Sequence, residues 1–460
     1  MNKDTIAAFA TNPGKSGIGI IRISGDKARE VISSIFLNKK KEKLIYTVDS
    51  HTIRYGYIFN EKGEMLDEVM VSYMKGPKSF TAEDVVEINC HGGIFVMQLI
   101  LQQVLKNGAR LAEPGEFTKR AFLNGRIDLS SAEAVMDVIS SENESALISS
   151  VSQLSGSLAE KIRSLREMII YEIAFIESAL DDPEHISLDG YEEELQEKIN
   201  EILRRISDLL DSYEKGKVMK DGIKTVILGK ANAGKSSLLN LLAGEDLAIV
   251  TDIPGTTRDV LKEQIRLHNL TLHIADTAGI RNTDDPIEKI GVERAKKLAD
   301  EADVILYMVD ASVPLNEYDF EIMNFIQNKK CIILLNKTDL FTVVTKEDQK
   351  LNSLNKVIIH TSVKKEKGIK ELEEELQKMF LSGKISSSEV IYITNERHRE
   401  SLFYAQKSIL EVQKSLELGM TEDFLTSDLM DAYENLGRII GETTDDDLVN
   451  EIFTKFCMGK

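Results

Sequence analysis

The sequence is poor in cysteine and has no long apolar run. Three cysteines, Cys90, Cys331 and Cys457, are scattered over 460 residues. A disulfide framework or a zinc site needs cysteines in paired, regular spacing, so we expect neither. The chain also lacks a stretch of about 18 uncharged apolar residues and the basic start and apolar run of a signal peptide. These absences predict a cytoplasmic protein with no membrane segment.

Positive charge is also scarce. The chain has 57 Lys and Arg against 76 Asp and Glu, a net charge of −19. Residues 1–118 are nearly neutral, with 15 basic and 14 acidic residues, whereas residues 119–215 have 10 basic and 21 acidic residues. An acidic surface is a poor match for phosphate backbones, because nucleic-acid binding depends on cationic contacts. If RNA is the target, we expect a partner protein to supply most of the basic surface.

Several composition changes along the chain indicate domains. Residues 1–118 contain β-rich runs at 18–23, 69–74 and 85–88 and a helical stretch at 94–107, which predicts an α+β domain. From Ser130, which with Glu133 has capping-box spacing, a helical pattern of apolar residues continues to about Leu180. A second helical stretch covers about 191–214.

Strand and helix signals then alternate, as in a doubly wound sheet, before a last helical stretch from about 395 to 456. That last piece is small for a core of its own. We therefore predict a multidomain α/β protein with an α+β domain (1–118), a helical domain in two parts (119–215 and 384–460) and, inserted between them, a P-loop, Ras-like doubly wound domain (216–383). Three domains in simple succession are the alternative.

The segment Gly229–Ser236, which reads GKANAGKS, lies between an apolar strand at 223–228 and the start of a helix. This is the context of a phosphate-binding loop, whose backbone N–H groups surround a polyphosphate. Lys235 would reach the β- and γ-phosphates, and the Ser236 hydroxyl would bind Mg²⁺. Thr257, in the GTTRD segment that follows, is the expected second Mg²⁺ hydroxyl. The Asp276–Gly279 segment, DTAG, is typical of a loop that senses the γ-phosphate.

The segment Asn336–Asp339, which reads NKTD, follows an apolar strand. It is the segment that we expect to recognise the base of the nucleotide. The Asp339 carboxylate can accept hydrogen bonds from the guanine N1–H and exocyclic amine, an edge that adenine lacks. The Lys337 stem can lie along the base, and the Ser362 loop can offer a backbone N–H. These motifs predict a GTP site.

The residues expected to contact GTP are Asn232, Ala233, Gly234, Lys235, Ser236, Ser237, Thr251, Asp252, Ile253, Pro254, Gly255, Thr256, Thr257, Asp276, Thr277, Ala278, Gly279, Asn336, Lys337, Asp339, Ser362, Val363 and Lys364.

The residue after DTAG is Ile280, where many switch GTPases have a water-orienting glutamine. Another group must therefore support catalysis. The Asn232 amide oxygen could help to hold a monovalent cation beside the phosphates, in the electrostatic role of an arginine finger. Glu288 and Glu293 follow in an acidic stretch, and by residue pattern alone we interpret either as part of a solvated helix face.

The chain resembles the MnmE (TrmE) family of tRNA modification GTPases in all three regions. The matching segments include Asp4–Ala8, Gly17–Gly25, Pro114–Thr118 and Arg120–Asn124. The ending Phe456-Cys457-Met458-Gly459-Lys460 is similar too. The resemblance implies an N-terminal folate-binding and dimerising domain, a helical domain and an inserted G domain.

The resemblance also implies roles for single residues. A tetrahydrofolate derivative (5-formyl- or 5,10-methylene-tetrahydrofolate) would contact Arg22, Glu87, Arg126 and Lys460; the family often has lysine at position 126. A K⁺ ion would be held by Asn232 and by groups of Thr251, Ile253 and Thr256. Glu288 matches the family's catalytic glutamate, which leaves Glu293 as surface. Cys457 is a candidate for the modification chemistry, with a buried structural thiol as the equal alternative.

The implied function is the addition of a carboxymethylaminomethyl-type group to C5 of the wobble uridine of certain tRNAs. The implied assembly is a homodimer through the N-terminal domain, joined in a heterotetramer with the partner MnmG (GidA), which carries FAD. Two alternatives differ in class: a ribosome-assembly GTPase of the Era/Der type, and a folate-dependent enzyme whose G domain is only regulatory.

Overall fold

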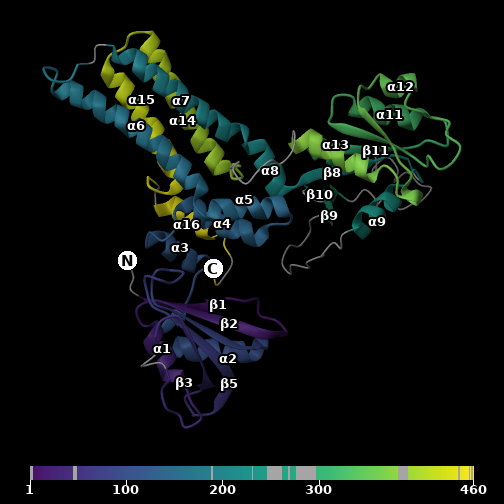
Figure 1. The fold of residues 1–460 in the computed structure, drawn as a ribbon. Coiled ribbons are helices and arrows are strands. Elements are labelled where there is room, and N and C mark those ends of the chain that lie inside the picture. Colours follow the sequence, from purple (N-terminus) through teal and green to yellow (C-terminus); the bar gives the residue numbers. More distant parts are fainter. Residues whose placement is uncertain are drawn as a thin grey trace. The chain divides into compact units, whose positions relative to one another are not determined.

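The computed structural model describes residues 4–44, 49–187, 190–230, 232–245, 262–267, 270–275, 297–381, 392–443, 446–454, 456 and 459. The chain divides into two compact units (Figure 1). The first contains residues 1–139, 151–206 and 401–460, and the second contains residues 140–150 and 207–400.

A seven-stranded sheet forms one part of the first unit, in the order β3-β4-β5-β6-β2-β1-β7. Its strands are β1 (Thr5–Phe9), β2 (Ser16–Ser24), β3 (Phe36–Leu37), β4 (Thr52–Phe59), β5 (Met65–Met74), β6 (Val85–Gly92) and β7 (Ala109–Leu111). All neighbours are antiparallel except β1 and β7, which run parallel.

Alternating side chains give this sheet one buried face. Val69, Val71 and Tyr73 on β5 are buried, whereas the residues between them are exposed or half-buried. The buried side chains pack with α1 (Ala28–Ile35) and α2 (Ile94–Lys106), which contact the sheet. The predicted strands at 18–23, 69–74 and 85–88 and the predicted helix at 94–107 are confirmed, because the period-2 and period-3.6 patterns there are both strong.

The rest of the first unit is helical, and Figure 1 shows its long helices side by side. The helices are α3 (Glu116–Leu123), α4 (Leu129–Ser140), α5 (Glu144–Leu154), α6 (Ser157–Asp181), α7 (Tyr191–Asp211), α14 (Glu396–Glu417), α15 (Glu422–Ile440) and α16 (Asp446–Thr454), of which α4, α5, α7 and α14 have residues in the second unit as well. Along α6, buried Leu158, Ile162, Leu165, Ile169 and Ile173 form one stripe that faces the core. α6 packs along α15.

The helical pattern predicted from Ser130 to about Leu180 is confirmed, and it is divided among three helices, α4, α5 and α6. Breaks occur at 141–143 and at Gly156, which has a left-handed backbone with φ of +92°. The predicted capping box at Ser130 was also wrong. The carboxylate of Asp128 caps this helix instead, since its Oδ1 accepts the Ser131 N–H at 2.9 Å.

The second unit is built on a six-stranded sheet in the order β13-β12-β11-β8-β10-β9. Its strands are β8 (Ile223–Leu228), β9 (Lys262–Leu267), β10 (Leu270–Ala275), β11 (Val304–Asp310), β12 (Cys331–Asn336) and β13 (Val357–His360). Its helices are α8 (Tyr213–Asp221), α9 (Lys235–Glu245), α11 (Glu317–Ile326), α12 (Gln349–Asn352) and α13 (Ile369–Leu381), with a 3₁₀ turn, η1, at Val363–Lys365.

Only β9 runs antiparallel to its neighbour in this sheet. The two faces of the six-stranded sheet contribute to separate apolar clusters. One cluster includes residues of α9 and α13, and the other includes residues of α11. Burial on both faces explains the unbroken apolar run of β11. β8 lies between β10 and β11, where the strand order reverses, and ligands of doubly wound sheets bind at this point. The predicted fold class, with its inserted doubly wound domain, is confirmed; the exact boundaries at 118, 215 and 383 remain predictions.

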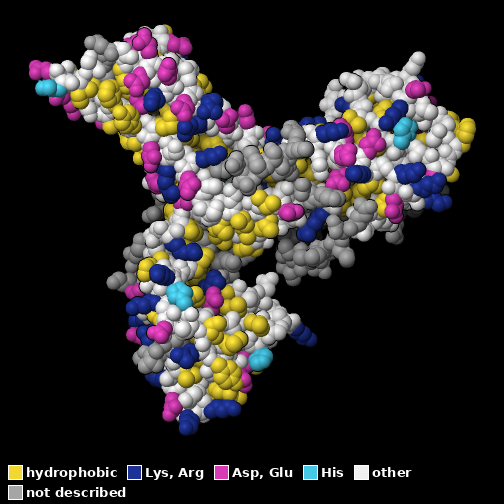
Figure 2. All heavy atoms as spheres, in the orientation of Figure 1, with side chains coloured by type: hydrophobic (Ala, Val, Ile, Leu, Met, Phe, Trp, Pro, Cys, Tyr) yellow, Lys and Arg dark blue, Asp and Glu magenta, His cyan; other side chains and the backbone are white. Residues whose placement is uncertain are grey.

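Among the described helices, none combines the length and apolar character needed to cross a bilayer. Acidic side chains are frequent on the long helices (Figure 2), including Glu192, Glu193 and Glu194 in the first turn of α7. Cys90 and Cys331 are buried strand residues, and burial raises the pKa of the Cys90 thiol to about 11 and that of Cys331 to about 12.

Candidate functional site

The loop between β8 and α9 has the strand–loop–helix context that the sequence predicts for phosphate binding. Gly229 and Gly234 have φ of +148° and +108°, and a Cβ at either position would lie 2.3 Å from a neighbouring atom, Met308 O and Asn336 Nδ2 respectively. Glycine is therefore required at both positions. Asn232 is also left-handed, with φ of +62°.

Lys235 lies at the start of α9, with its ammonium held inside the loop. Its Nζ donates to the backbone carbonyl oxygens of Gly229 and Lys230, both at 2.7 Å. Burial lowers the pKa of Lys235, because the charged form is desolvated there. An anion beside the ammonium would favour the charged form. The third N–H of the ammonium can serve a phosphate oxygen.

A buried network behind the loop was not predicted from the sequence. Lys230, within the phosphate-binding segment, forms an ion pair with Asp319, whose side chain is 3% exposed. Tyr307 on β11 donates its hydroxyl to the same carboxylate at 3.0 Å. Asp319 also completes a capping box with Asn316 at the start of α11. The capping pattern Asn316-x-x-Asp319 was a readable signal, but its contact with Lys230 depends on the sheet order.

The base-reading segment begins at the end of β12. The buried Asn336 side chain donates from Nδ2 to Ala233 O at 2.8 Å, and its Oδ1 accepts the Val363 N–H at 3.2 Å. The Asp339 carboxylate accepts the Ser362 hydroxyl at 2.7 Å, and this hydrogen bond is the largest of the effects that lower the pKa of Asp339. Asp339 is therefore held in its acceptor form.

Lys337, the second residue of this segment, has a left-handed backbone with φ of +63°. Its Nζ lies 2.6 Å from Asp310 Oδ2 at the end of β11. The ion pair fixes the head of the side chain, and this leaves the methylene stem as the part that can contact a base.

These residues line one cavity of about 710 Å³, a size typical of small-molecule sites. The lining residues are Asn232, Gly234, Lys235, Ser236, Ser237, Leu241, Asn336, Lys337, Asp339, Leu340, Val363 and Lys364. The structure thus brings the phosphate loop and the base-reading segment together. Ala233 and Ser362 join this group through their bonds to Asn336 and Asp339.

Other predicted site residues lie outside the described residues, and their roles stay predictions. They are Thr251, Asp252, Ile253, Pro254, Gly255, Thr256, Thr257, Asp276, Thr277, Ala278, Gly279, Ile280, Glu288, Glu293, Cys457 and Lys460. Of the predicted Mg²⁺ ligands the structure therefore describes Ser236, and of the predicted K⁺ ligands Asn232.

Of the predicted folate residues, Arg22 and Arg126 lie over one aromatic ring, and Glu87 pairs with Arg22. Arg22 on β2 faces Glu87 on β6 across the sheet, with 2.8 Å between Nε and Oε1. The guanidinium carbons of Arg22 and Arg126 lie 5.4 and 5.1 Å from the centre of the Phe80 ring. The sequence did not point to Phe80, because its position follows from packing that no local pattern records.

Arg22 also reaches the end of the chain. Its Nη1 donates to the backbone carbonyl of Gly459 at 3.2 Å, and its guanidinium lies over the Phe117 ring at 5.7 Å. Gly459 has φ of +87°, and a Cβ there would lie 1.9 Å from Phe9 O. Glycine therefore lets the chain end approach β1, next to the predicted folate residues.

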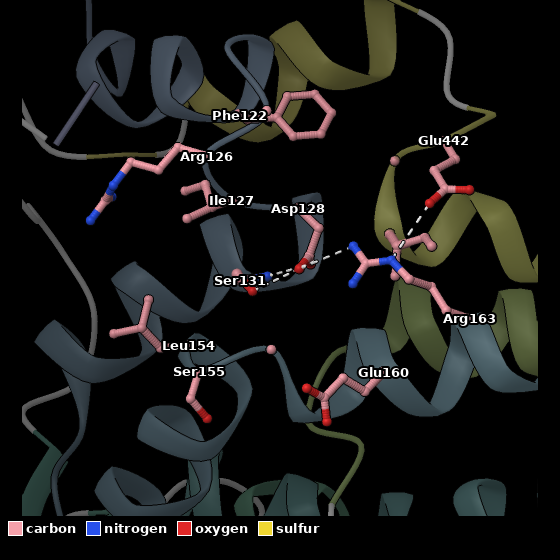
Figure 3. Close-up of a pocket in the computed structure, with 14 residues that line it drawn as sticks. Phe122, Arg126, Ile127, Asp128, Ser131, Leu154, Ser155, Glu160, Arg163 and Glu442 are labelled. Atoms are coloured by element: carbon pink, nitrogen blue, oxygen red, sulfur yellow. Dashed lines mark hydrogen bonds and ion pairs between the residues drawn. The ribbon is translucent and has the colours of Figure 1, made fainter. Parts of the chain in front are cut away.

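A second cavity, of about 410 Å³, lies beside Arg126 (Figure 3). Arg163 lies between two carboxylates there, 3.9 Å from Asp128 and 3.7 Å from Glu442. Figure 3 shows the Arg126 side chain pointing away from this row of charges. Phe122, Ile127, Leu154 and Ile440 provide apolar lining. Three of the charged lining residues, Asp128, Arg163 and Glu442, are thus paired with each other.

Comparison with known proteins covers the whole chain. The family model for the MnmE helical domain matches residues 129–457, and that for the GTP-binding protein TrmE N-terminus matches residues 5–126. The chain is 54% identical to the tRNA modification GTPase MnmE of Lachnoclostridium phytofermentans, over 100% of both chains. It is 49% identical to that of Acetivibrio thermocellus, over 100% of this chain and 99% of the relative.

Among solved structures, the chain is similar to a point variant of Aquifex aeolicus Era bound to GDP and AlF₄⁻. The two are 28% identical, with a TM-score of 0.26, over 41% of this chain and 67% of that one.

Proposed function

The chain belongs to the family of the tRNA modification GTPase MnmE, and from this premise we propose that it hydrolyses GTP to drive the modification of the wobble uridine of certain tRNAs. The family relationship extends over the full sequence, which favours this function over a ribosome-assembly role of the Era/Der type. The chemistry of the described cavity supports the nucleotide part of the proposal.

Guanine recognition would depend on Asp339. Its ionised carboxylate can accept from the N1–H and the exocyclic amine of guanine, a pair of donors that adenine does not present. The Ser362 hydroxyl orients that carboxylate. A polyphosphate would lie over the loop at the start of α9, where backbone N–H groups and the Lys235 ammonium favour negative charge. Mg²⁺, held by the hydroxyl of Ser236 with that of Thr257, would neutralise phosphate charge.

Hydrolysis in the proposal relies on a cation and a carboxylate. Asn232 lines the cavity, so its amide oxygen can join backbone or side-chain oxygens of Thr251, Ile253 and Thr256 in holding K⁺. An amide oxygen is a suitable ligand for a hard cation. Glu288 would orient the attacking water, the part that Ile280 cannot perform.

The modification itself would need a one-carbon donor and a redox partner. A tetrahydrofolate derivative supplies the carbon when bound, and Arg22, Glu87, Arg126 and Lys460 would contact it, with Glu87 accepting from its pterin edge and Arg126 and Lys460 available for its anionic tail. The Arg22–Glu87 ion pair, with Arg22 and Arg126 both over the Phe80 ring, fits a ligand that has charged, polar and aromatic parts. We further propose a homodimer through the N-terminal domain and an FAD-carrying partner, MnmG, which would also contribute basic surface for tRNA.

The observation that carries the proposal is the single cavity shared by Lys235, Asn336 and Asp339 in a chain of this family. The test is a reconstitution with the purified chain, MnmG, tRNA, a tetrahydrofolate donor and GTP, followed by mass spectrometry of the tRNA nucleosides. We expect a modified wobble uridine that depends on GTP. Glu288→Ala should still bind GTP but lose both turnover and modification. Modification that proceeds equally well without GTP would refute the proposal.

A further inference from the structure

The short connection between α4 and α5, residues 141–143, contacts the start of the doubly wound sheet. These contacts all lie within the second unit, which contains residues 140–150 and 207–400. Asn143 is 9% exposed, and its Nδ2 donates to Met219 O at 3.0 Å and to Thr271 Oγ1 at 3.2 Å. Its Oδ1 accepts the Ala146 N–H at 2.8 Å. One amide side chain thus joins α5 to two parts of the α/β domain.

Both partners of Asn143 belong to the frame of the nucleotide site. Thr271 lies at the start of β10, and Met219 lies near the end of α8, just before β8 begins at Ile223. β8 and β10 are parallel neighbours in the sheet, with Leu272 opposite Ile223. β8 leads directly into the phosphate loop at Gly229, and β10 leads toward the predicted DTAG segment. A movement at the carboxyl ends of β8 and β10 can therefore shift the hydrogen-bond partners of Asn143, because the strands between them are held by the hydrogen bonds of the sheet.

Glu142 makes a second contact with the same sheet. Its Oε1 accepts the Gln264 Nε2–H at 3.0 Å on β9. Its Oε2 is buried and has no hydrogen-bond partner among the residues that the structure describes, and His273 Nε2 lies 3.6 Å away. Gln264 and His273 are opposite each other in the β9–β10 pair. A buried carboxylate oxygen left short of a donor costs free energy, and a small shift of β10 would bring His273 into hydrogen-bond range.

The other end of this connection is α5 itself. Its first residues, 144–150, belong to the second unit, and its last residues, 151–154, belong to the first. α5 is one continuous helix, Glu144–Leu154. An N-cap that is hydrogen-bonded to α8 and to β10 can therefore alter the stability of α5, a helix that has residues in both units.

We propose that Asn143, supported by Glu142, is a positioning residue that couples the nucleotide state of the sheet to α5, and so to the helical part of the chain. The inference rests on the proposed function, in which GTP turnover drives a conformational cycle. It goes further by naming the atoms that transmit the change: Asn143 Nδ2, Met219 O and Thr271 Oγ1.

The test uses substitutions that remove the hydrogen bonds from Asn143 to Met219 and Thr271 but keep a side chain that caps α5. Asn143→Ser retains a good N-cap for α5 but is too short to reach Met219 O and Thr271. Thr271→Val keeps nearly the same side-chain shape and removes the hydroxyl that accepts from the Asn143 amide. Thr225→Val is the matched control, since Thr225 is an equally buried threonine on β8 and, within the described part of the chain, its hydroxyl bonds only to nearby Ile223 O.

The readout is hydrogen exchange of residues 144–154 in the full chain, with GDP and with a non-hydrolysable GTP analogue, in K⁺ buffer. We expect a nucleotide-dependent difference in the native chain and in Thr225→Val, and its loss in Asn143→Ser and Thr271→Val. The KM for GTP should change by no more than about threefold in all of them. Because a merely structural cap survives in Asn143→Ser, loss of the difference there supports the coupling role.

Two results would overturn the inference: no nucleotide-dependent exchange in the native chain, or the same difference in Asn143→Ser and Thr271→Val as in the native chain. Glu142→Gln, with exposed Glu144→Gln as its control, repeats the test without altering the Asn143 side chain that caps α5.

Failure of the proposed function would show elsewhere, as a native chain that binds GTP analogue but modifies no tRNA in the reconstitution. The exchange result decides the inference in either case.

Discussion

Asn336 donates its side-chain N–H to the backbone carbonyl of Ala233 at 2.8 Å, across 103 residues of sequence. The same amide accepts the Val363 N–H at 3.2 Å through Oδ1. One buried side chain therefore connects the phosphate loop, the base-reading segment and the loop after β13. The spacing between the phosphate-binding and base-binding halves of the cavity is set by this contact.

Asn336→Ala should weaken GDP and GTP binding together. The substitution leaves the Ala233 carbonyl and the Val363 N–H without their partner, and each unsatisfied buried group costs about 1–3 kcal/mol. We expect a loss of affinity of about tenfold or more, measured by titration with a fluorescent guanine nucleotide. Asn328→Ala, at an exposed turn, is the control. An unchanged affinity would show that the two halves are held together by other contacts.

Asp339→Asn should change which purine is bound. The amide presents N–H donors where the carboxylate presented acceptors, so it mismatches guanine and matches the 2-oxo group of xanthine. We expect GTP binding to fall and xanthosine triphosphate binding to rise, in competition titrations with both nucleotides. The fold should be unaffected, because Asp339 bonds to the Ser362 hydroxyl, which can also donate to an amide oxygen. Retained preference for GTP would place the base elsewhere.

Turnover should depend on the monovalent cation through Asn232. We expect GTP hydrolysis in K⁺ to exceed that in Na⁺ by about tenfold or more, as for other fixed charges at a developing anion. Asn232→Gly removes the side chain but tolerates the left-handed backbone, φ of +62°, at this position. The variant should bind GTP and lose the preference for K⁺. If it keeps that preference, the cation does not depend on this amide.

A buried ionic cluster in the first unit should make stability sensitive to acid. Glu116 lies 2.5 Å from Arg110 and 2.9 Å from Arg120. Burial by itself raises the pKa of Glu116, but the hydrogen bonds and charges of the two arginines outweigh it and lower the pKa below the ordinary value of 4.5. A lowered folded-state pKa adds stability above the unfolded value, and this stability is lost as pH falls through the folded value.

Glu116→Gln should therefore be destabilised by about 2 kcal/mol at neutral pH, and the difference from the native chain should shrink below about pH 4.5. Calorimetric unfolding midpoints across pH 3.5 to 7 would show this, with exposed Glu113→Gln as the control. A difference that stays constant over that range would mean that the carboxylate charge contributes nothing.

Much of the fold class and the nucleotide motifs could be predicted from the sequence, because period-2 and period-3.6 patterns and the phosphate-loop spacing are local properties. Local patterns did not locate Phe80, which joins Arg22 to Arg126, or the Lys230–Asp319 ion pair behind the phosphate loop. Those contacts arise from strand order and helix packing. The cap at Asp128 was missed for a different reason, since several polar residues competed for one helix start.

The break at 141–143 was missed because the apolar pattern continues across it. Asn143 is a common cap residue, but only the nearby β10 and α8 give its amide partners, and they follow more than 70 residues later. Sequence patterns therefore located the residues that meet the nucleotide more readily than those that connect the nucleotide site to the rest of the chain.

The most direct measurement is the wobble nucleoside content of tRNA from cells that lack this chain, compared with cells that regain it. We expect the deletion cells to lose the carboxymethylaminomethyl-type group at C5 of wobble uridine. We also expect recovery with the native chain and no recovery with Asp339→Asn. Normal wobble uridines in the deletion cells, or full recovery with a chain that cannot bind GTP, would contradict the account.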